Sequence, residues 1–161
     1  MIEITKNLFI GSDYDFISQV KGKPNWNVIH ACKIPYHKQL LGYVGNAAPK
    51  NDPEYLIAIR ENILYLNLVD ANSPKYIPKK IIDTSIEFID KSLQENKKCL
   101  VHCNKGESRS PSIGLLYLAY KHILPDTFEA AERNFRQIYP DYNPNNGIRS
   151  FIIIHWKDYI K

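Results

Sequence analysis

The sequence predicts an α/β domain in which a central, mostly parallel sheet is flanked by helices. Short apolar segments alternate with longer segments whose apolar residues recur at helical spacing, and this alternation is typical of layered α/β folds. The segment from Cys99 to Cys103 is short and mostly apolar, as expected for a strand inside a parallel sheet. The longest helical pattern, at 78–96, presents one apolar face made of Ile81, Ile82, Ile86, Ile89 and Leu93.

The first 32 residues predict two short strands, a short helix and a third strand. Residues 4–11 have the pattern of two strands joined by a turn at Lys6-Asn7. Ser12 is a favourable N-cap residue for the short helix that follows. The third strand covers Trp26 to Cys32.

The middle of the chain predicts a long loop, a brief helix and one strong strand. Residues 33–52 are rich in Gly, Asn and Pro and carry no regular apolar pattern, so we expect a loop. Asp52-Pro53 resembles the N-cap and first-turn proline of a brief helix that runs through Arg60. Asn62 to Val69 (NILYLNLV) predicts a strand.

Three helices are predicted in the last third of the chain. Residues 110–122 are apolar nearly all round, which indicates a buried helix. Asp126 is the expected N-cap of a helix that runs through Tyr139, and residues 147–159 form the last helix. With 161 residues, of which 44% are hydrophobic, the chain has the size of one domain, and we expect residues 1–161 to form it.

The composition indicates the cellular compartment and argues against several classes of partner. The net charge of +4 is spread along the chain, so no basic stripe indicates a nucleic-acid partner. The first residues lack the apolar core of a signal peptide, and no run reaches the ~20 apolar residues of a membrane span. Cys32, Cys99 and Cys103 have no framework spacing and too few neighbouring histidines for zinc. We expect a cytoplasmic monomer with free thiols, without membrane association, metal or cofactor.

The segment between the last predicted strand and the buried helix has the character of an anion-binding loop. Pro111 is tolerated only in the first turn of a helix, so that helix begins near Arg109 or Ser110. Gly106 gives the backbone the freedom to curl, and the N–H groups of residues 104–109 can then point to one spot. Such a ring of donors at a helix N-terminus binds anions.

Three side chains around this loop suit phosphate chemistry. A positive potential at the base of the loop favours the thiolate form of Cys103, which is the nucleophilic form. The planar guanidinium of Arg109, six residues further on, matches two phosphate oxygens at once. The hydroxyl of Ser110 can donate a hydrogen bond to the sulfur.

His102 to Ser110 (HCNKGESRS) resembles the HC-x5-R-[ST] signature of the cysteine-based protein tyrosine phosphatases, and more closely their dual-specificity branch. Three further segments resemble that branch in the same order: ITKNLFIGS at the start, NILYLNLVD ending at Asp70, and PNNGI at 144–148. The resemblance therefore covers most of the chain. The long 33–52 segment, Lys105 and Glu107 depart from the usual pattern of the branch.

The resemblance implies roles for particular residues and a phosphorylated protein as substrate. Cys103 is the expected nucleophile, which forms a phosphocysteine, and Asp70 is the expected general acid and base. His102 and Asn145 are expected to support the loop, and Ser110 to assist the sulfur. The expected phosphate-binding residues are Asn104, Lys105, Gly106, Glu107, Ser108 and Arg109.

Purely structural roles are open for several of these residues, and other activities are open for the chain. Asp70 could be a turn or cap residue, although Asp83 and Asp90 fall inside a predicted helix and suit acid catalysis less. His102 could be a packed core histidine, and Asn145 a simple cap. The chain could be a phosphate-binding module with weak catalysis, or a phosphatase for lipid, RNA or sugar phosphates. The carboxylate of Glu107 disfavours substrates with several phosphates. The sequence has no tyrosine-rich recognition loop of the kind that deepens the pocket of strictly tyrosine-specific relatives, so we expect phosphotyrosine and, more slowly, phosphoserine and phosphothreonine.

Overall fold

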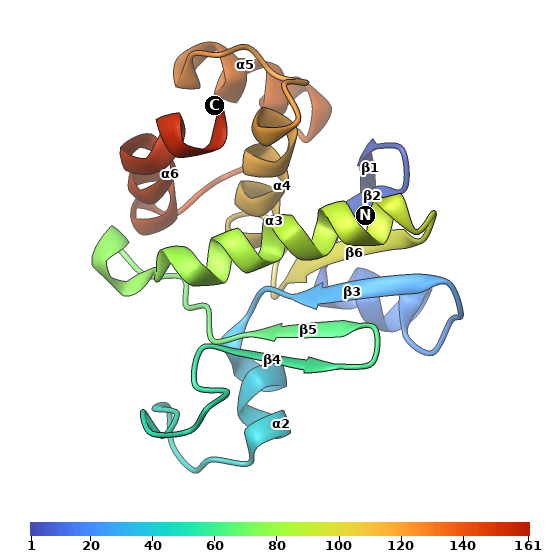
Figure 1. The fold of residues 1–161 in the computed structure, drawn as a ribbon, viewed down its shortest axis with the longest axis vertical. Helices are drawn as coiled ribbons and strands as arrows, with labels where there is room; N and C mark the ends of the chain where they lie inside the picture. Colours follow the sequence, from blue (N-terminus) through green and yellow to red (C-terminus); the bar gives the residue numbers. More distant parts are fainter.

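The computed structural model describes residues 1–161 and has a six-stranded mixed sheet at its centre (Figure 1). The strands are β1 (Ile2–Thr5), β2 (Leu8–Ser12), β3 (Trp26–His30), β4 (Ile57–Arg60), β5 (Ile63–Leu66) and β6 (Lys98–Cys103). Their order is β1-β2-β6-β3-β5-β4, in which β2, β6, β3 and β5 run parallel and the two edge strands run antiparallel. The predicted α/β class with a mostly parallel sheet is confirmed.

Helices cover both faces of the sheet. The longer ones are α3 (Lys79–Gln94), α4 (Arg109–Tyr120), α5 (Phe128–Ile138) and α6 (Asn146–Tyr159). The shorter ones are α1 (Asp13–Asp15), η1 (Phe16–Val20), η2 (Lys33–His37), α2 (Lys38–Leu41) and η3 (Pro74–Tyr76). Helices α3 and α4 pack against β6, while α5 and α6 pack on α4 and complete that layer (Figure 1). Helix η1 contacts β6, and η2 contacts β3 and β5.

The central strand β6 is buried on both faces because helices lie on each side of it. Cys99, Leu100 and Val101 have no exposed surface. Leu100 belongs to a small cluster with Phe16 and Val20 of η1, whereas Cys99 and Val101 belong to the main core. Side chains alternate across a strand, so an uninterrupted apolar run is what a strand between two helical layers requires.

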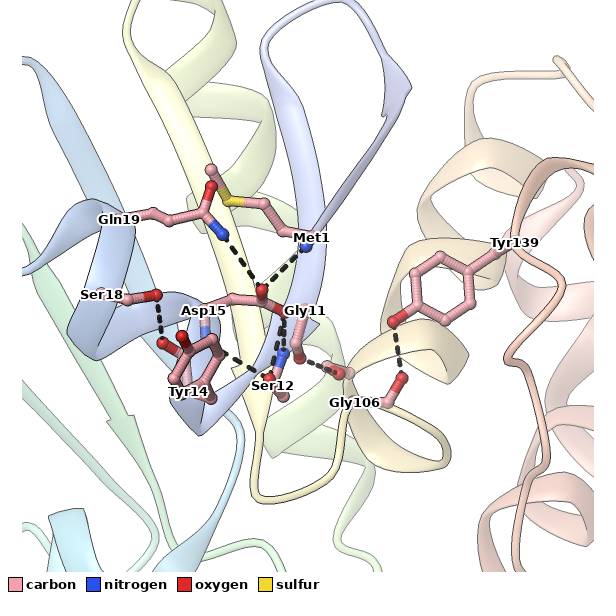
Figure 2. Close-up of polar contacts among 10 residues, drawn as sticks. Met1, Gly11, Ser12, Tyr14, Asp15, Ser18, Gln19, Gly106 and Tyr139 are labelled. Atoms are coloured by element: carbon pink, nitrogen blue, oxygen red, sulfur yellow. Dashed lines mark hydrogen bonds and ion pairs between the residues drawn. The ribbon is translucent and has the colours of Figure 1, made fainter.

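The predicted start of the chain is confirmed. Asn7 has a positive φ of 65°, which makes the turn between β1 and β2 tight. The Ser12 hydroxyl accepts a hydrogen bond from the Asp15 backbone N–H, and the Asp15 carboxylate accepts one from the Ser12 N–H, which together form a capping box (Figure 2). Strand β3 ends at His30, two residues before the predicted end.

The prediction of a featureless loop over residues 33–52 is wrong for its first half. Helices η2 and α2 occupy Lys33–Leu41, and Gly42 ends them with a left-handed φ of 74°. Pro35 and Gly42 are among the residues whose composition indicates a loop, but Gly42 is the C-cap residue that ends α2. Two consecutive short helices are too brief to show helical periodicity, so composition alone suggested a loop.

The predicted helix from Asp52 through Arg60 is also wrong. Asp52 does cap a turn, because its carboxylate accepts a hydrogen bond from the Glu54 N–H at 2.8 Å. The chain then enters strand β4, which forms an antiparallel hairpin with β5. Glu61 has a positive φ of 52° in the hairpin turn. This turn contains no glycine, so the usual sequence signal of a tight hairpin is missing.

The later helices agree with prediction, with one correction at a cap. Helix α5 has Thr127 at its N-cap, without a side-chain capping bond, and not Asp126. The carbonyl of Asp126 instead accepts a hydrogen bond from the indole N–H of Trp156 at 2.7 Å. Helix α6 begins at Asn146, where the Asn145 side chain accepts from the Asn146 N–H. No helix combines the length and apolar character that crossing a bilayer would require.

Candidate active site

The predicted site residues gather where β2 and β6 end and α4 begins. Ser12 and Cys103 are register partners at the ends of these two parallel strands. A cavity of about 490 Å³ opens there. A larger groove of about 690 Å³ lies between α3, β3 and the turn that joins β4 to β5, and its lining contains neither cysteine nor arginine. The smaller cavity is lined by Asp70, Cys103, Asn104, Lys105, Glu107, Ser108, Arg109, Asn143, Pro144 and Asn145.

The loop over residues 104–108 packs directly on the backbone of β2. Gly106 has a φ of 73°, and a Cβ atom there would lie 2.8 Å from the carbonyl carbon of Gly11. Only glycine fits this approach, so Gly106 serves the curl that the sequence predicted. The hydroxyl of Tyr139, from the C-terminal end of α5, donates to the Gly106 carbonyl at 2.6 Å and holds the loop from the other side (Figure 2).

The backbone of the loop has free hydrogen-bond donors. No backbone–backbone hydrogen bond of the protein takes its donor from residues 104–108, although loop carbonyls do accept bonds, such as Asn104 from the Asp13 N–H. Helix α4 starts at Arg109, so its first N–H groups also lack intrahelical partners. A loop with this arrangement at a helix N-terminus can bind an anion.

The Arg109 side chain is held in place by neutral acceptors. One Nη donates to the Leu68 carbonyl at 3.0 Å, and the other donates to the side-chain oxygen of Asn104 at 2.6 Å. The amide nitrogen of Asn104 donates in turn to the carbonyl of Ile34 in η2. The Nε atom of Arg109 is buried and has no protein partner. An orphaned buried donor beside a cavity is costly unless a ligand pairs with it.

The sulfur of Cys103 lies at the base of the cavity and contacts one hydroxyl. Cys103 is 2% exposed, and its Sγ lies 3.2 Å from the Oγ of Ser110. Ser110 also donates to the Gly11 carbonyl at 3.0 Å, so its single hydrogen can serve either neighbour. Burial raises the pKa of the Cys32 and Cys99 thiols to about 12, which keeps both protonated near neutral pH.

Asp70 reaches the same cavity from the segment after β5. Its carboxylate accepts a hydrogen bond from the Ser108 hydroxyl at 2.8 Å. Its backbone carbonyl accepts another from the side-chain amide of Asn145 at 3.0 Å. Asp83 and Asp90 lie in α3 and bond to residues of α4, α6 and their surroundings, away from this cavity. Among the three aspartates considered from the sequence, the structure therefore places only Asp70 beside Cys103.

His102 points away from the cavity, into an aromatic cluster on the opposite face of the sheet. Its ring stacks on Phe16, with centroids 4.9 Å apart, and its Nε2 contacts the Nδ1 of His30. Tyr36 stacks on His30 at 3.8 Å and bonds through its hydroxyl to Asp13. Burial lowers the pKa of His102 to about 4 and also lowers that of His30, so both rings are neutral at pH 7.

Sequence reasoning missed the groups that brace the site from distant segments. Tyr139, the Leu68 carbonyl and the Ile34 carbonyl carry no local motif, and only the fold brings them to the loop. Asn143 also braces the loop, because its N–H donates to the Glu107 carbonyl at 2.8 Å. Such contacts between segments far apart in sequence could not be found from a single chain.

A mixed sheet with a cysteine–arginine loop at its strand ends is the arrangement of a tyrosine phosphatase-like domain. Residues 27–157 match the family model described as "Dual specificity phosphatase, catalytic domain". This match covers more than half of the chain, which therefore belongs to the dual specificity phosphatase family. The resemblance carried by the loop motif is thereby confirmed.

Known relatives agree with this assignment. Human dual specificity protein phosphatase 9 is 29% identical over 123 residues, which are 63% of this chain and 32% of that protein. Tyrosine-protein phosphatase vhp-1 of Caenorhabditis elegans is 24% identical over 161 residues, which are 98% of this chain and 22% of that protein. The chain thus spans about a third or less of the length of these two relatives. The crystal structure of human DUSP28 has the same fold, with a TM-score of 0.66, 15% identity, and coverage of 98% of this chain and 92% of that chain.

The buried histidine pair predicts a loss of stability in mild acid. In the unfolded chain His102 binds a proton below pH 6.5, whereas in the folded chain it stays neutral down to about pH 4. The same holds for His30, so the unfolded state holds more protons in this window, and the free energy of unfolding falls as pH drops through it, by about 1.4 kcal/mol per pH unit for each histidine. Urea denaturation between pH 7 and pH 4 measures this slope.

The control compares this pair with an exposed histidine. His102→Gln removes one of the titrating rings and should flatten the pH dependence of unfolding. His122→Asn replaces an exposed histidine and should keep the wild-type slope. Equal slopes in wild type and His102→Gln would contradict the assignment of the acid sensitivity to this pair.

Proposed function

We propose that this domain hydrolyses phosphate monoesters of protein side chains through a phosphocysteine intermediate. One observation carries the proposal: the Cys103 sulfur lies at the base of a cavity whose loop N–H groups and Arg109 Nε have no protein partners. A phosphoryl group seated there would pair with these donors, and its phosphorus would face the sulfur. Membership of the dual specificity phosphatase family supports the same reaction class.

In the first step the Cys103 thiolate attacks phosphorus. The S–P bond forms while the bond from phosphorus to the leaving oxygen breaks, and Asp70 gives its proton to that oxygen. The loop N–H groups and Arg109 stabilise the charge on the three equatorial oxygens. The Ser110 hydroxyl, 3.2 Å from the sulfur, stabilises the thiolate and later the departing sulfur.

In the second step water attacks the phosphocysteine. Asp70, now a carboxylate, accepts a proton from this water, so the O–P bond forms as the S–P bond breaks. Inorganic phosphate leaves and Asp70 is again protonated for the next cycle. The thiolate of Cys103 is regenerated beside Ser110. All proton transfers are accounted for by Asp70, the substrate and water.

The cavity walls favour singly phosphorylated side chains. None of the ten lining residues is aromatic, so no side-chain ring is present to stack on phosphotyrosine and restrict the site to it. Lys105 and Glu107 are both exposed at the mouth and place opposite charges beside the anion site. The Glu107 carboxylate repels additional phosphates by about 1 kcal/mol at a surface dielectric. We therefore infer activity on phosphotyrosine and, more slowly, on phosphothreonine and phosphoserine.

Replacing the nucleophile separates catalysis from binding. Cys103→Ser should abolish turnover of para-nitrophenyl phosphate, because a serine hydroxyl is not ionised near neutral pH. The loop and Arg109 remain, so the variant should still bind inorganic phosphate in calorimetry. If the serine variant retained more than a small fraction of the wild-type rate, Cys103 would not be the nucleophile.

Asp70→Asn tests the general acid through the leaving group. The variant should lose ~10²–10⁴-fold in kcat/KM for phenyl phosphate, whose leaving oxygen needs a proton. The loss should be much smaller for para-nitrophenyl phosphate, because its leaving group departs as a stable anion. Asp83→Asn, in α3 and away from the cavity, is the matched control and should match wild type on both substrates. An equal loss on both substrates would point to another acid.

A substrate panel tests the protein preference. Values of kcat/KM are compared for phosphotyrosine, phosphothreonine and phosphoserine peptides, a phosphoinositide and an RNA 5′-phosphate. Phosphotyrosine peptides should be the best substrates. In Glu107→Lys the repulsion is replaced by attraction, so the phosphoinositide should gain relative to the peptides. A phosphoinositide that exceeds every phosphopeptide in wild type would overturn the preference.

A further inference from the structure

Ser108 belongs to the expected phosphate-binding loop by sequence, yet its hydroxyl is engaged by Asp70 and Asn145. The residue is 7% exposed. Its Oγ lies 2.8 Å from Oδ1 of Asp70 and 2.9 Å from the backbone nitrogen of Asn145. The Ser108 hydroxyl therefore joins the loop, the candidate general acid and the segment before α6.

The direction of these hydrogen bonds is fixed by their partners. A backbone N–H can only donate, so the Ser108 oxygen accepts from Asn145. A serine hydroxyl has one hydrogen, and the remaining partner is the Asp70 carboxyl group. Ser108 must therefore donate its hydrogen to Oδ1 of Asp70.

Asn145 holds the same aspartate by its backbone. The Asn145 side-chain oxygen accepts from the Asn146 N–H at 2.8 Å, which fixes the orientation of the amide group. Its Nδ2 then donates to the Asp70 carbonyl at 3.0 Å. Asp70 is exposed, and these two contacts tie its carboxyl group and its backbone to the buried frame of the site.

We propose that Ser108 is the positioning residue of the general acid, and that it does not bind phosphate through its hydroxyl. This inference rests on the proposed function, in which Asp70 protonates the leaving oxygen. Because Oδ1 accepts from Ser108, the proton of the neutral acid resides on Oδ2. That oxygen gives its proton to the leaving group and later receives one from water, while the Ser108 hydrogen stays in place throughout. Asn145 supports this arrangement through the Asp70 carbonyl.

The test is a double-mutant cycle between Ser108 and Asp70, in which kcat/KM is measured for two substrates that differ in their leaving group. Ser108→Ala should lower kcat/KM about tenfold or more for phenyl phosphate and less than about threefold for para-nitrophenyl phosphate, since only part of the general-acid contribution is lost. In an Asp70→Asn background, Ser108→Ala should cost less than about twofold, because the group it positions no longer donates a proton. Ser108→Thr keeps the hydroxyl and should restore most of the phenyl phosphate rate.

Further readouts separate positioning from phosphate binding and from folding. The inhibition constant of inorganic phosphate should be the same for wild type and Ser108→Ala. Thermal unfolding checks that each variant is folded. If Ser108→Ala is unstable, Asn145→Ser takes its place, because serine keeps a helix cap but lacks the amide donor to Asp70. Asn145→Ser should then lose more activity on phenyl phosphate than on para-nitrophenyl phosphate. Weaker phosphate binding together with equal losses on both substrates would overturn the inference.

Different results would contradict the proposed reaction and the proposed role of Ser108. If Cys103→Ser remains active, the proposed reaction is wrong. If Asp70→Asn loses activity on phenyl phosphate selectively but Ser108→Ala does not, the reaction stands and the role of Ser108 is wrong. If Ser108→Ala costs as much in the Asp70→Asn background as in wild type, Ser108 acts independently of the acid, and the inference is again overturned.

Discussion

The close contact between the backbones of Gly11 and Gly106 sets the position of the loop that follows Cys103. Because no side chain fits between them, the loop after β6 lies on the end of β2 and curls there. The same strand end supplies the carbonyl to which Ser110 donates, and Asp13, just beyond it, donates its N–H to Asn104. A displacement of the loop away from β2 would break both of these hydrogen bonds together.

The charge of Arg109 is the second determinant of the site. Its protein partners are a backbone carbonyl and an amide oxygen, and it forms no ion pair with a carboxylate. A buried guanidinium without a counterion carries a desolvation cost of several kcal/mol. Neutral acceptors orient the guanidinium but do not cancel its charge, so its positive charge stays available to an anion in the cavity.

The central part of the fold could be predicted because its signals are local. Leu100 and its neighbours form an uninterrupted apolar run, and Ser12 and Gly106 are typical cap and turn residues. The loop motif brought Cys103 and Arg109 together, and the structure places both at one cavity. The roles of these residues stay predictions until their variants are measured.

The remainder could not be predicted because it depends on contacts between distant segments. Strand β4 exists through pairing with β5, around a turn without glycine, and Gly42 ends two helices too short for periodicity. The contact between the Ser108 hydroxyl and Asp70 could not be predicted either, because a motif states where a residue lies in the chain and not where its hydroxyl points. Tyr139 reaches Gly106 across 33 residues, and no pattern in a single sequence reports such a contact.

Gly147, at the start of α6, joins the last helix to the segment that carries Asp70. Its N–H donates to the Ala71 carbonyl at 3.1 Å, and a Cβ atom at this position would lie 2.1 Å from that oxygen. The two segments therefore touch without an intervening side chain. A chain that stopped after α4 would lose this contact at Ala71, and it would also lose the Tyr139 hydroxyl and the Asn143 N–H that brace the loop after β6. The part of the chain after α4 therefore anchors both halves of the candidate site, the loop that follows Cys103 and the segment that carries Asp70.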